Sequence, residues 1–375
     1  MAMGYDIIIA GGGLAGLTSA IHLSRAGLHV LVIEKHPFPR HKVCGEYISN
    51  EVLPYLQWLG ADPAVLAPAQ ISRVLVSSAG GKTIEAPLPL GGFGISRYAL
   101  DYFLQQQAVN NGCTIITATV TDIFYEDESF LVHTAGSGVF KARVVLGAYG
   151  KRAALDQRLS RDYVGEKSPW LAVKAHYAGD FPDGLVALHN FPGGYCGVSK
   201  IEDNKLNICY LVNYETFKRY KDPAIHRQEV LCSNVHLKKI FDNSRLLFEQ
   251  PLTISQVSFA EKSKVENHIL MIGDTAGLIH PLCGNGMAMA VHSAKIASEG
   301  VLRFFHGNGY TRQQLEADYI REWNRLFKGR MQTGRRLTEL FLKDRLSMLL
   351  IRGLASVPAL LPFIIKQTHG RPINV

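Results

Sequence analysis

A β-branched apolar run leads directly into a cluster of glycines near the N-terminus, Tyr5-Asp6-Ile7-Ile8-Ile9-Ala10-Gly11-Gly12-Gly13-Leu14-Ala15-Gly16. The run is typical of a buried parallel strand, and the helical pattern that follows it ends at Gly27. A second strand is expected over residues 29–33, directly before Glu34. This order of strand, glycine turn, helix, strand and acidic residue predicts a Rossmann-like, dinucleotide-binding unit in an α/β fold.

The glycines of this turn have separate physical tasks. Gly11 allows the tight turn, Gly13 lets a pyrophosphate approach the backbone, and Gly16 lets the helix pack close to the strand. The first helical turn, which includes Ala15, offers unpaired N–H groups and the positive end of a helix dipole to the phosphates. Glu34 stands where a carboxylate can accept hydrogen bonds from a ribose diol. These residues predict binding of FAD or NAD(P).

A second set of glycines follows another apolar strand, residues 268–272, in the order Gly273-Asp274-Thr275-Ala276-Gly277 and then Gly284-Asn285-Gly286. The spacing resembles the flavin-binding segment of the geranylgeranyl reductase family, within the hydroxybenzoate-hydroxylase-like flavoproteins. The resemblance implies FAD as the cofactor and Asp274 as a ligand of its ribityl chain. It also implies backbone N–H contacts from Gly286 and Met287 to the flavin pyrimidine ring, where a helix N-terminus stabilises the negative charge of reduced flavin.

Two shorter motifs agree with this resemblance. Lys42-Val43-Cys44-Gly45-Glu46-Tyr47 is similar to a family stretch whose backbone lies along the flavin, which implies Cys44, Gly45 and Tyr47 as flavin-site positions. Arg97 begins an Arg-x-x-x-Asp-x-x-Leu helix start, and the resemblance implies that it approaches the charged middle of the cofactor; a solvated arginine on a helix face is the alternative. The strand after Gly112 is expected to pass the adenine, with backbone contacts from Val120.

The sequence departs from the family pattern in two places. Tyr149 stands where relatives usually carry an aspartate that is associated with the pyrophosphate and with NAD(P)H, so NAD(P)H remains only a possible electron donor. The stretch 191–199 lacks the tryptophans that geranylgeranyl reductases and flavin halogenases carry nearby, and this argues against halogenation and weakens the case for prenyl reduction without excluding it.

Alternating segments between the cofactor motifs predict an antiparallel substrate sheet that is interleaved in sequence with the cofactor domain. The predicted domains are a discontinuous FAD-binding domain (1–70, 95–165 and 262–305), a substrate domain (71–94 and 166–261) and a C-terminal helical segment (306–375). Substrate is expected where the second sheet faces the flavin ring. The candidate lining side chains are Tyr195, Cys196 and His189, each of which could equally be an ordinary sheet residue.

Composition restricts the class of protein further. The chain has 375 residues, 47% of them hydrophobic and 19% charged, which excludes a disordered protein. Residues 311–375 hold 12 Lys and Arg against 5 Asp and Glu, so they carry +7 of the net charge of +8. We recognise no nucleic-acid-binding module, and we expect no nucleic-acid partner. Six scattered cysteines without zinc spacing predict no metal site, and with the absence of a signal-peptide pattern they favour a cytoplasmic protein.

The basic C-terminal segment has two interpretations. Residues 311–345 show a basic amphipathic helical pattern, and residues 346–365 are mostly apolar but are interrupted by Arg352, Pro358 and Pro362. A central arginine and two prolines disfavour a membrane-spanning helix. We therefore predict a helical lid with peripheral membrane contact through residues 311–365, with a helical hairpin that only covers the core as the alternative.

Together these features predict an FAD-dependent oxidoreductase that transfers hydride from reduced flavin to a lipophilic unsaturated substrate, as the resemblance to geranylgeranyl reductases implies. An FAD-dependent aromatic monooxygenase acting on a phenolic or polyketide-like substrate is the alternative, and a non-redox flavin-dependent cyclase is a third possibility. No nucleophile–base pair stands out in the sequence, so catalytic residues are not assigned.

Overall fold

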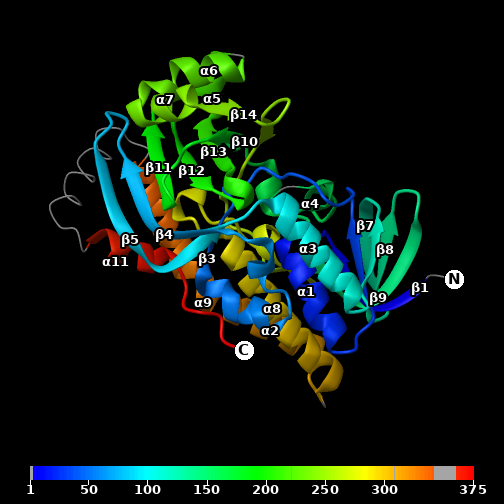
Figure 1. Ribbon diagram of the computed structural model, residues 1–375. Helices are drawn as coiled ribbons and strands as arrows, with labels where there is room; N and C mark the ends of the chain where they lie inside the picture. The colour runs from blue at the N-terminus through cyan, green and yellow to red at the C-terminus, as the bar shows by residue number, and fades with distance from the viewer. Residues whose placement is uncertain (1–2, 152, 221, 308, 342–359) are drawn as a thin grey trace.

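The computed structural model describes residues 3–151, 153–220, 222–307, 309–341 and 360–375, and it contains two sheets with helices around them (Figure 1). The first sheet has the order β16-β17-β9-β1-β2-β6, with β7 and β8 joined to it through β9. Its path is parallel except for the pair β16–β17, and the β7-β8-β9 meander is antiparallel. The strands are β1 (Met3–Ala10), β2 (Val30–Glu34), β6 (Thr114–Thr117), β7 (Val120–Glu126), β8 (Ser129–Thr134), β9 (Gly138–Gly147), β16 (Val265–Glu266) and β17 (Ile269–Met271).

The core of this domain follows from the apolar strand that opens the chain. Ile7, Ile8 and Ile9 have no exposed surface, and β1 lies inside the sheet between β9 and β2. Burial of one such side chain contributes about 1.5–3 kcal/mol. Helix α1 (Leu14–Arg25) packs between α3 (Arg97–Asn110) and α8 (Gly286–His306), and α8 packs in turn against α9 (Arg312–Phe341). This arrangement brings the two glycine-rich segments, far apart in sequence, to one edge of the sheet.

The second sheet has the order β14-β10-β13-β12-β11-β4-β5-β3, and β15 pairs with β10. Its neighbours are antiparallel apart from the parallel pair β4–β11. The strands are β3 (Tyr47–Ser49), β4 (Ala69–Ser77), β5 (Thr83–Gly94), β10 (Trp170–Gly179), β11 (Gly184–Phe191), β12 (Gly194–Lys200), β13 (Leu206–Asn213), β14 (Ser244–Leu246) and β15 (Leu252–Ser255). The predicted combination of a parallel-rich cofactor sheet and a largely antiparallel second sheet is confirmed.

The segment 1–70, predicted as part of the cofactor domain, contributes to both sheets. β3 pairs with β5, and β4 begins at Ala69, so the chain crosses to the second sheet earlier than the alternation of its sequence indicates. The physical reason is that β3 is only three residues long, too short to show a period-two pattern.

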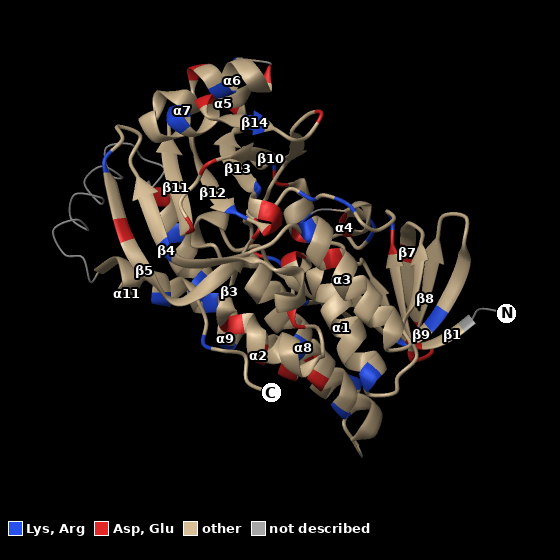
Figure 2. Cartoon of the chain, viewed as in Figure 1, with Lys and Arg blue, Asp and Glu red and all other residues tan. Residues whose placement is uncertain are grey.

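Helices pack against the second sheet at two places. Helices α5 (Tyr214–Lys218), α6 (Pro223–Glu229) and α7 (Val235–Asp242) cover it at the end away from the cofactor domain, and α11 (Leu360–Thr368) lies against β5 (Figure 1). The remaining helical elements are α2 (Leu53–Trp58), α4 (Ala154–Arg158) and the short 3-10 turns η1 (Asn50–Val52), η2 (Pro63–Leu66), η3 (Asp162–Gly165), η4 (Glu202–Asn204), η5 (Leu231–Ser233), η6 (Gly273–Thr275) and η7 (Pro281–Cys283). Lysines and arginines are spread over elements of both domains in the view of Figure 2 rather than gathered on one element.

Candidate functional site

A cavity of about 790 Å³ lies between the two sheets. One part of its wall comes from the β1–α1 turn, the end of β2, the start of α3, η6 and the start of α8. The other part comes from β4, β11, β12, β13 and α11. Most of the predicted cofactor positions line it, namely Gly11, Gly13, Ala15, Glu34, Cys44, Gly45, Tyr47, Arg97, Val120, Asp274, Gly286 and Met287.

The β1–α1 turn uses its glycines in two ways. A Cβ at Gly16 would lie 2.0 Å from the Gly11 carbonyl oxygen, and one at Gly11, whose φ is +117°, would lie 2.4 Å from the Ala148 oxygen. These two glycines are therefore required by packing, and Gly16 lies behind the cavity wall. At Gly13 a Cβ would approach only the Arg97 Nη2 atom, at 3.8 Å. This open space beside uncapped helical N–H groups fits a pyrophosphate.

Glu34 is held at the end of β2 by the same turn. Its carboxylate accepts a hydrogen bond from the Gly12 N–H at 2.8 Å and one from Arg40 Nη2 at 3.2 Å. The side chain is buried and still lines the cavity. Such a fixed carboxylate is suited to bind a ribose hydroxyl.

A buried cluster supplies positive charge next to Gly13. Arg97 makes two hydrogen bonds of 2.7 Å to Asp101, and Lys42 Nζ donates to the same carboxylate at 2.8 Å. Burial alone would raise the pKa of Asp101, but Arg97 and Lys42 hold it below its usual range, so the carboxylate is charged. Two cations against one anion leave a net positive charge at the cavity wall, which complements a diphosphate. The Arg97 side chain is 13% exposed and is held in this ion pair.

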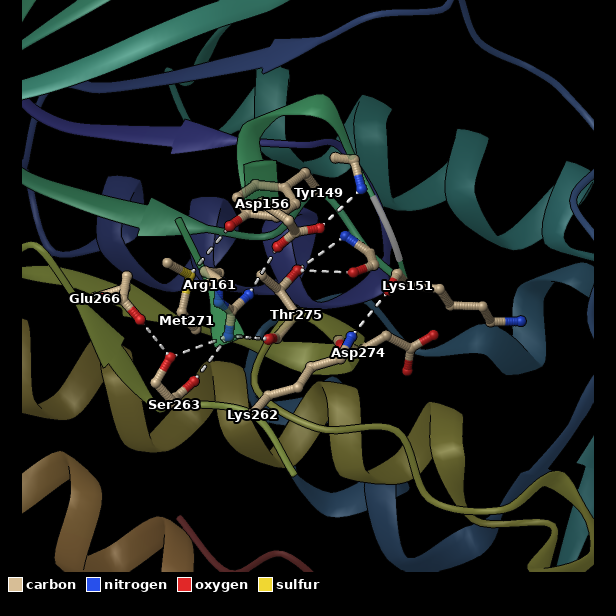
Figure 3. A network of polar contacts seen from close by, with 12 residues as sticks. Tyr149, Lys151, Asp156, Arg161, Lys262, Ser263, Glu266, Met271, Asp274 and Thr275 are labelled. Carbon is tan, nitrogen blue, oxygen red and sulfur yellow. Dashed lines mark hydrogen bonds and ion pairs between the residues drawn. The ribbon is translucent and has the colours of Figure 1, made fainter. Parts of the chain in front are cut away.

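Figure 3 shows how the loops after β9 and β17 are tied together. Lys262 Nζ donates to the Lys151 and Asp274 carbonyl oxygens, each at 2.9 Å. The Thr275 hydroxyl accepts from the Gly150 N–H at 2.8 Å, and Arg161 donates to the Thr275 carbonyl oxygen at 3.0 Å. These contacts fix the segment that presents the Asp274 side chain to the cavity.

Tyr149, the departure from the family pattern, lies in the same network (Figure 3). It lines the cavity, and its hydroxyl is 3.6 Å from the Met271 sulfur. Its neighbour is a fully buried ion pair of Arg161 and Asp156 at 2.9 Å. At the position where the resemblance implies an acid, this chain therefore has a neutral aromatic side chain whose pKa is raised by burial.

The start of α8 is open to the cavity. Gly286 and Met287 line it, and the preceding Asn285 makes no side-chain cap to the helix. The Cys44 and Met287 sulfur atoms are 3.4 Å apart, and the Tyr47 ring packs against Gly284. The free N–H groups at the start of α8 thus lie beside the 42–47 loop. The resemblance implies that the flavin ring binds at such a place.

The sequence reasoning missed a buried ion cluster beneath this loop. The Glu46 carboxylate accepts hydrogen bonds from Lys174 Nζ at 2.9 Å and from the Arg97 N–H at 2.8 Å, and it pairs with His176 Nε2 at 2.7 Å. Glu46 and Lys174 have no exposed surface. Burial opposes the charge on Glu46, but His176 and Lys174 lower its pKa below the usual range. The motif around Cys44 contains Glu46, whereas nothing in β10 marks Lys174 as its partner.

The three candidate substrate residues separate onto two faces of the second sheet. Tyr195 lines the cavity, whereas His189 and Cys196 are absent from its lining. Cys196 is buried in the core under α5–α7, and His189 Nδ1 lies 2.8 Å from the Ser77 hydroxyl. The interpretation of His189 and Cys196 as cavity residues does not hold, because side chains alternate across a strand and His189 is paired with Cys196 in the β11–β12 ladder.

The part of the cavity bounded by the second sheet is an apolar arm, as its lining shows. The arm is lined by Val74, Val76, Leu88, Ala172, Val186, Leu188, Leu211, Ile254, Val257, Leu278, Leu282, Leu337, Leu361, Ile364 and Ile365. A charged group would lose most of its hydration among these side chains.

The fold and this site are those of a flavoprotein with an FAD-binding domain and a second, largely antiparallel sheet. The chain belongs to the FAD binding domain family, whose pattern it matches over residues 4–313, and it is an FAD-dependent oxidoreductase of that family.

Comparison with known proteins adds distant relatives of two kinds. The chain is 24% identical over 340 residues to digeranylgeranylglycerophospholipid reductase from Methanosarcina mazei, with 85% of this chain and 80% of the relative covered. It is also 24% identical over 326 residues to tryptophan 2-halogenase from Chondromyces crocatus, covering 80% of this chain but 62% of the halogenase. The structure of the flavin-dependent brominase Bmp2 superposes with a TM-score of 0.80 at 20% identity, over 98% of this chain and 93% of the brominase. The resemblance to geranylgeranyl-type reductases is thereby confirmed, with flavin halogenases as further relatives.

No helix within residues 3–341 and 360–375 that the structure describes has the length and apolarity needed to cross a membrane. In the same residues no group of three or more His, Cys, Asp or Glu side chains is arranged to hold a metal ion.

Proposed function

We propose that this protein transfers hydride from reduced FAD to an activated carbon–carbon double bond of a lipophilic substrate. The observation that carries the proposal is the apolar arm, which belongs to the same cavity as the start of α8 and the 42–47 loop. A substrate held in the arm would lie against whatever occupies that junction. Bound FAD would supply the two-electron chemistry, as cofactors do in such enzymes.

The residues of the chain would then have distinct roles in holding the cofactor. Gly13 and the α1 N-terminus would bind the diphosphate, with Arg97 providing charge. Glu34 would bind the adenosine ribose, with Val120 near the adenine, and Asp274 would bind the ribityl chain. The N–H groups of Gly286 and Met287 would stabilise negative charge on the pyrimidine ring, because a helix N-terminus carries partial positive charge. The apolar arm excludes water from the junction.

The test is a single-turnover reaction without oxygen. The holoenzyme is reduced by NADPH or dithionite under argon and mixed with prenylated lipids and phenols, and flavin reoxidation is followed at the visible absorption bands. Reoxidation with a product two mass units heavier than the substrate supports the proposal. A strict need for oxygen would contradict it in favour of the monooxygenase, and a product of unchanged mass would indicate a non-redox role.

We further propose that α11 brings the protein to membrane surfaces. Leu361 faces the cavity and is 7% exposed, whereas Leu360 and Phe363 on the outer side are 40% and 59% exposed. Apolar groups on the outside of a lid over an apolar cavity suit a lipid surface from which substrate enters. The predicted contact through 311–365 also involves residues 342–359, which lie outside the described residues.

A flotation assay with anionic vesicles tests this contact. Phe363→Ser is expected to lower the vesicle-bound fraction several-fold. Ile225→Ser, which changes a half-exposed residue on the distant α6, should leave binding unaltered. Equal loss in both variants, or in neither, argues against α11 as the contact.

A further inference from the structure

The C-terminal tail is fastened to the start of α8. Asn285 Nδ2, just before that helix, donates to the Thr368 carbonyl oxygen at 2.8 Å. A few residues later, the Ile373 N–H donates to the Glu51 carbonyl oxygen at 2.8 Å. Both Asn285 and Glu51 are fully buried. The segment between these two anchors, which begins with His369, therefore has a fixed place beside the α8 N-terminus.

The hydrogen bonds of His369 define which of its nitrogen atoms carries the proton. Nδ1 lies 3.1 Å from the Ile365 carbonyl oxygen, which can only accept. The Thr368 hydroxyl, 3.3 Å from Nδ1, itself donates to the same carbonyl oxygen at 3.0 Å. Nδ1 is therefore the protonated atom, and Nε2 has a free lone pair. Burial lowers the pKa of His369 to about 4, so the ring is neutral at physiological pH.

The free lone pair is buried in the wall of the cavity. Nε2 has no hydrogen-bond partner among the residues that the structure describes, although His369 lines the cavity. The His369 ring lies 6.4 Å from the ring of Tyr47, on the loop that meets the α8 N-terminus, and Ile365, one turn earlier, lines the apolar arm. The acceptor thus stands where the apolar arm joins the proposed flavin site. A buried acceptor without a donor is unfavourable, so a ligand that supplies a donor gains affinity.

The donor must come from a group with an O–H or N–H. The pyrimidine carbonyl oxygens of a flavin, which the N–H groups of Gly286 and Met287 would bind, are acceptors and cannot pair with Nε2, whereas the N3–H between them is a donor that the variants below separate from a substrate hydroxyl. A hydrocarbon chain has no donor at all. We propose that His369 accepts a hydrogen bond from a hydroxyl group at the head of the substrate, whose lipophilic part lies in the apolar arm. This rests on the function proposed above and narrows its substrate class to lipophilic phenols and alcohols.

A matched pair of probes tests the proposal by binding alone. 4-Nonylphenol and its methyl ether, 4-nonylanisole, share an apolar chain but differ in the hydroxyl donor. Dissociation constants for both are measured on the FAD-loaded full-length protein by difference spectroscopy of the flavin bands. Wild type is expected to bind the phenol about 10-fold more tightly than the ether, the effect of one hydrogen bond to a buried acceptor.

Three variants assign the preference to His369. His369→Leu should bind the two probes equally, and His369→Gln, which restores an acceptor, should recover most of the preference. Gln367→Leu removes a polar side chain at an exposed position two residues away and should behave as wild type.

Two results would overturn the proposal. One is equal binding of phenol and ether by wild type. The other is a flavin spectrum that changes in His369→Leu without any probe while the phenol preference persists, since the donor would then belong to the flavin. FAD content is measured in each sample: a protein that binds no FAD refutes the proposed function, whereas a loaded protein without phenol preference refutes only the role of His369.

Discussion

The two parts of the cavity are built on different principles. The cofactor part consists of backbone N–H groups, glycines and buried charges, and each position there has a steric or electrostatic reason, as at Gly13 and Arg97. The apolar arm consists of aliphatic side chains from strands and α11 that share only their polarity. We therefore expect single substitutions to weaken binding more in the cofactor part of the cavity than in the apolar arm, where many side chains contribute.

Gly13→Val should have the largest effect on FAD binding and be confined to the cofactor part. The backbone at Gly13 is extended (φ −89°, ψ −174°), so valine fits the fold, but its side chain fills the space expected for the diphosphate. FAD affinity should fall by about 100-fold, equivalent to about 2.7 kcal/mol. Isothermal titration of the apoprotein with FAD measures this, with Gly80→Val as a control at an open hairpin glycine. Equal FAD affinity in Gly13→Val and wild type would remove this glycine from the site.

Glu46→Leu should lower the stability of the protein where the cofactor part of the cavity meets the apolar arm. It leaves Lys174 buried without its partner, which costs about 3–5 kcal/mol. Urea denaturation measures the loss, and the double variant Glu46→Leu with Lys174→Met should recover part of it. A double variant no more stable than the single one would show that the pair does not act as a unit.

The same carboxylate predicts acid sensitivity. The pKa of Glu46 is lower in the folded protein than in the unfolded chain, so its contribution is complete above the unfolded value of about 4.3 and is lost as the pH falls through the folded value. Wild type should therefore lose stability below about pH 4 more steeply than the double variant. Parallel acid-denaturation profiles of the two proteins would contradict this.

Lys262→Met should weaken FAD binding about 10-fold with little change in fold, because one cation that bridges the Lys151 and Asp274 carbonyl oxygens is lost. Burial lowers the pKa of Lys262 to about 8. Its positive charge, which favours an anionic cofactor, is complete below that pH and is lost above it. Wild-type FAD affinity should therefore decline between pH 7 and pH 9, and that of Lys262→Met should decline less. A decline of the same size in both would assign the pH effect elsewhere.

Ile364→Ala should have the smallest effect and appear only in the apolar arm. Loss of lining methyl and methylene groups should lower affinity for 4-nonylanisole about 5-fold and leave FAD affinity unchanged. Leu360→Ala, on the outer side of the same helix, is the matched control. Reduced FAD affinity in Ile364→Ala would show that the two parts are not independent.

The amino-acid sequence alone indicated most of the residues that line the cofactor part of the cavity. The order of strand, glycines and helix around Gly11, Gly13 and Gly16, and the segment around Asp274, are local signals, because a turn or a helix start depends on residues adjacent in the chain. The fold class and the FAD-dependent oxidoreductase class followed from them.

The contacts between residues far apart in the chain became evident only from the tertiary structure. Pairing of Glu46 with Lys174 and bridging of two loops by Lys262 join residues more than a hundred positions apart, and the position of the tail places His369 beside α8. It also decided that Tyr195 faces the cavity while His189 and Cys196 face away, since the face of a strand depends on its register. Local sequence patterns indicate which functional groups a segment carries. Long-range packing determines which of these functional groups come into contact.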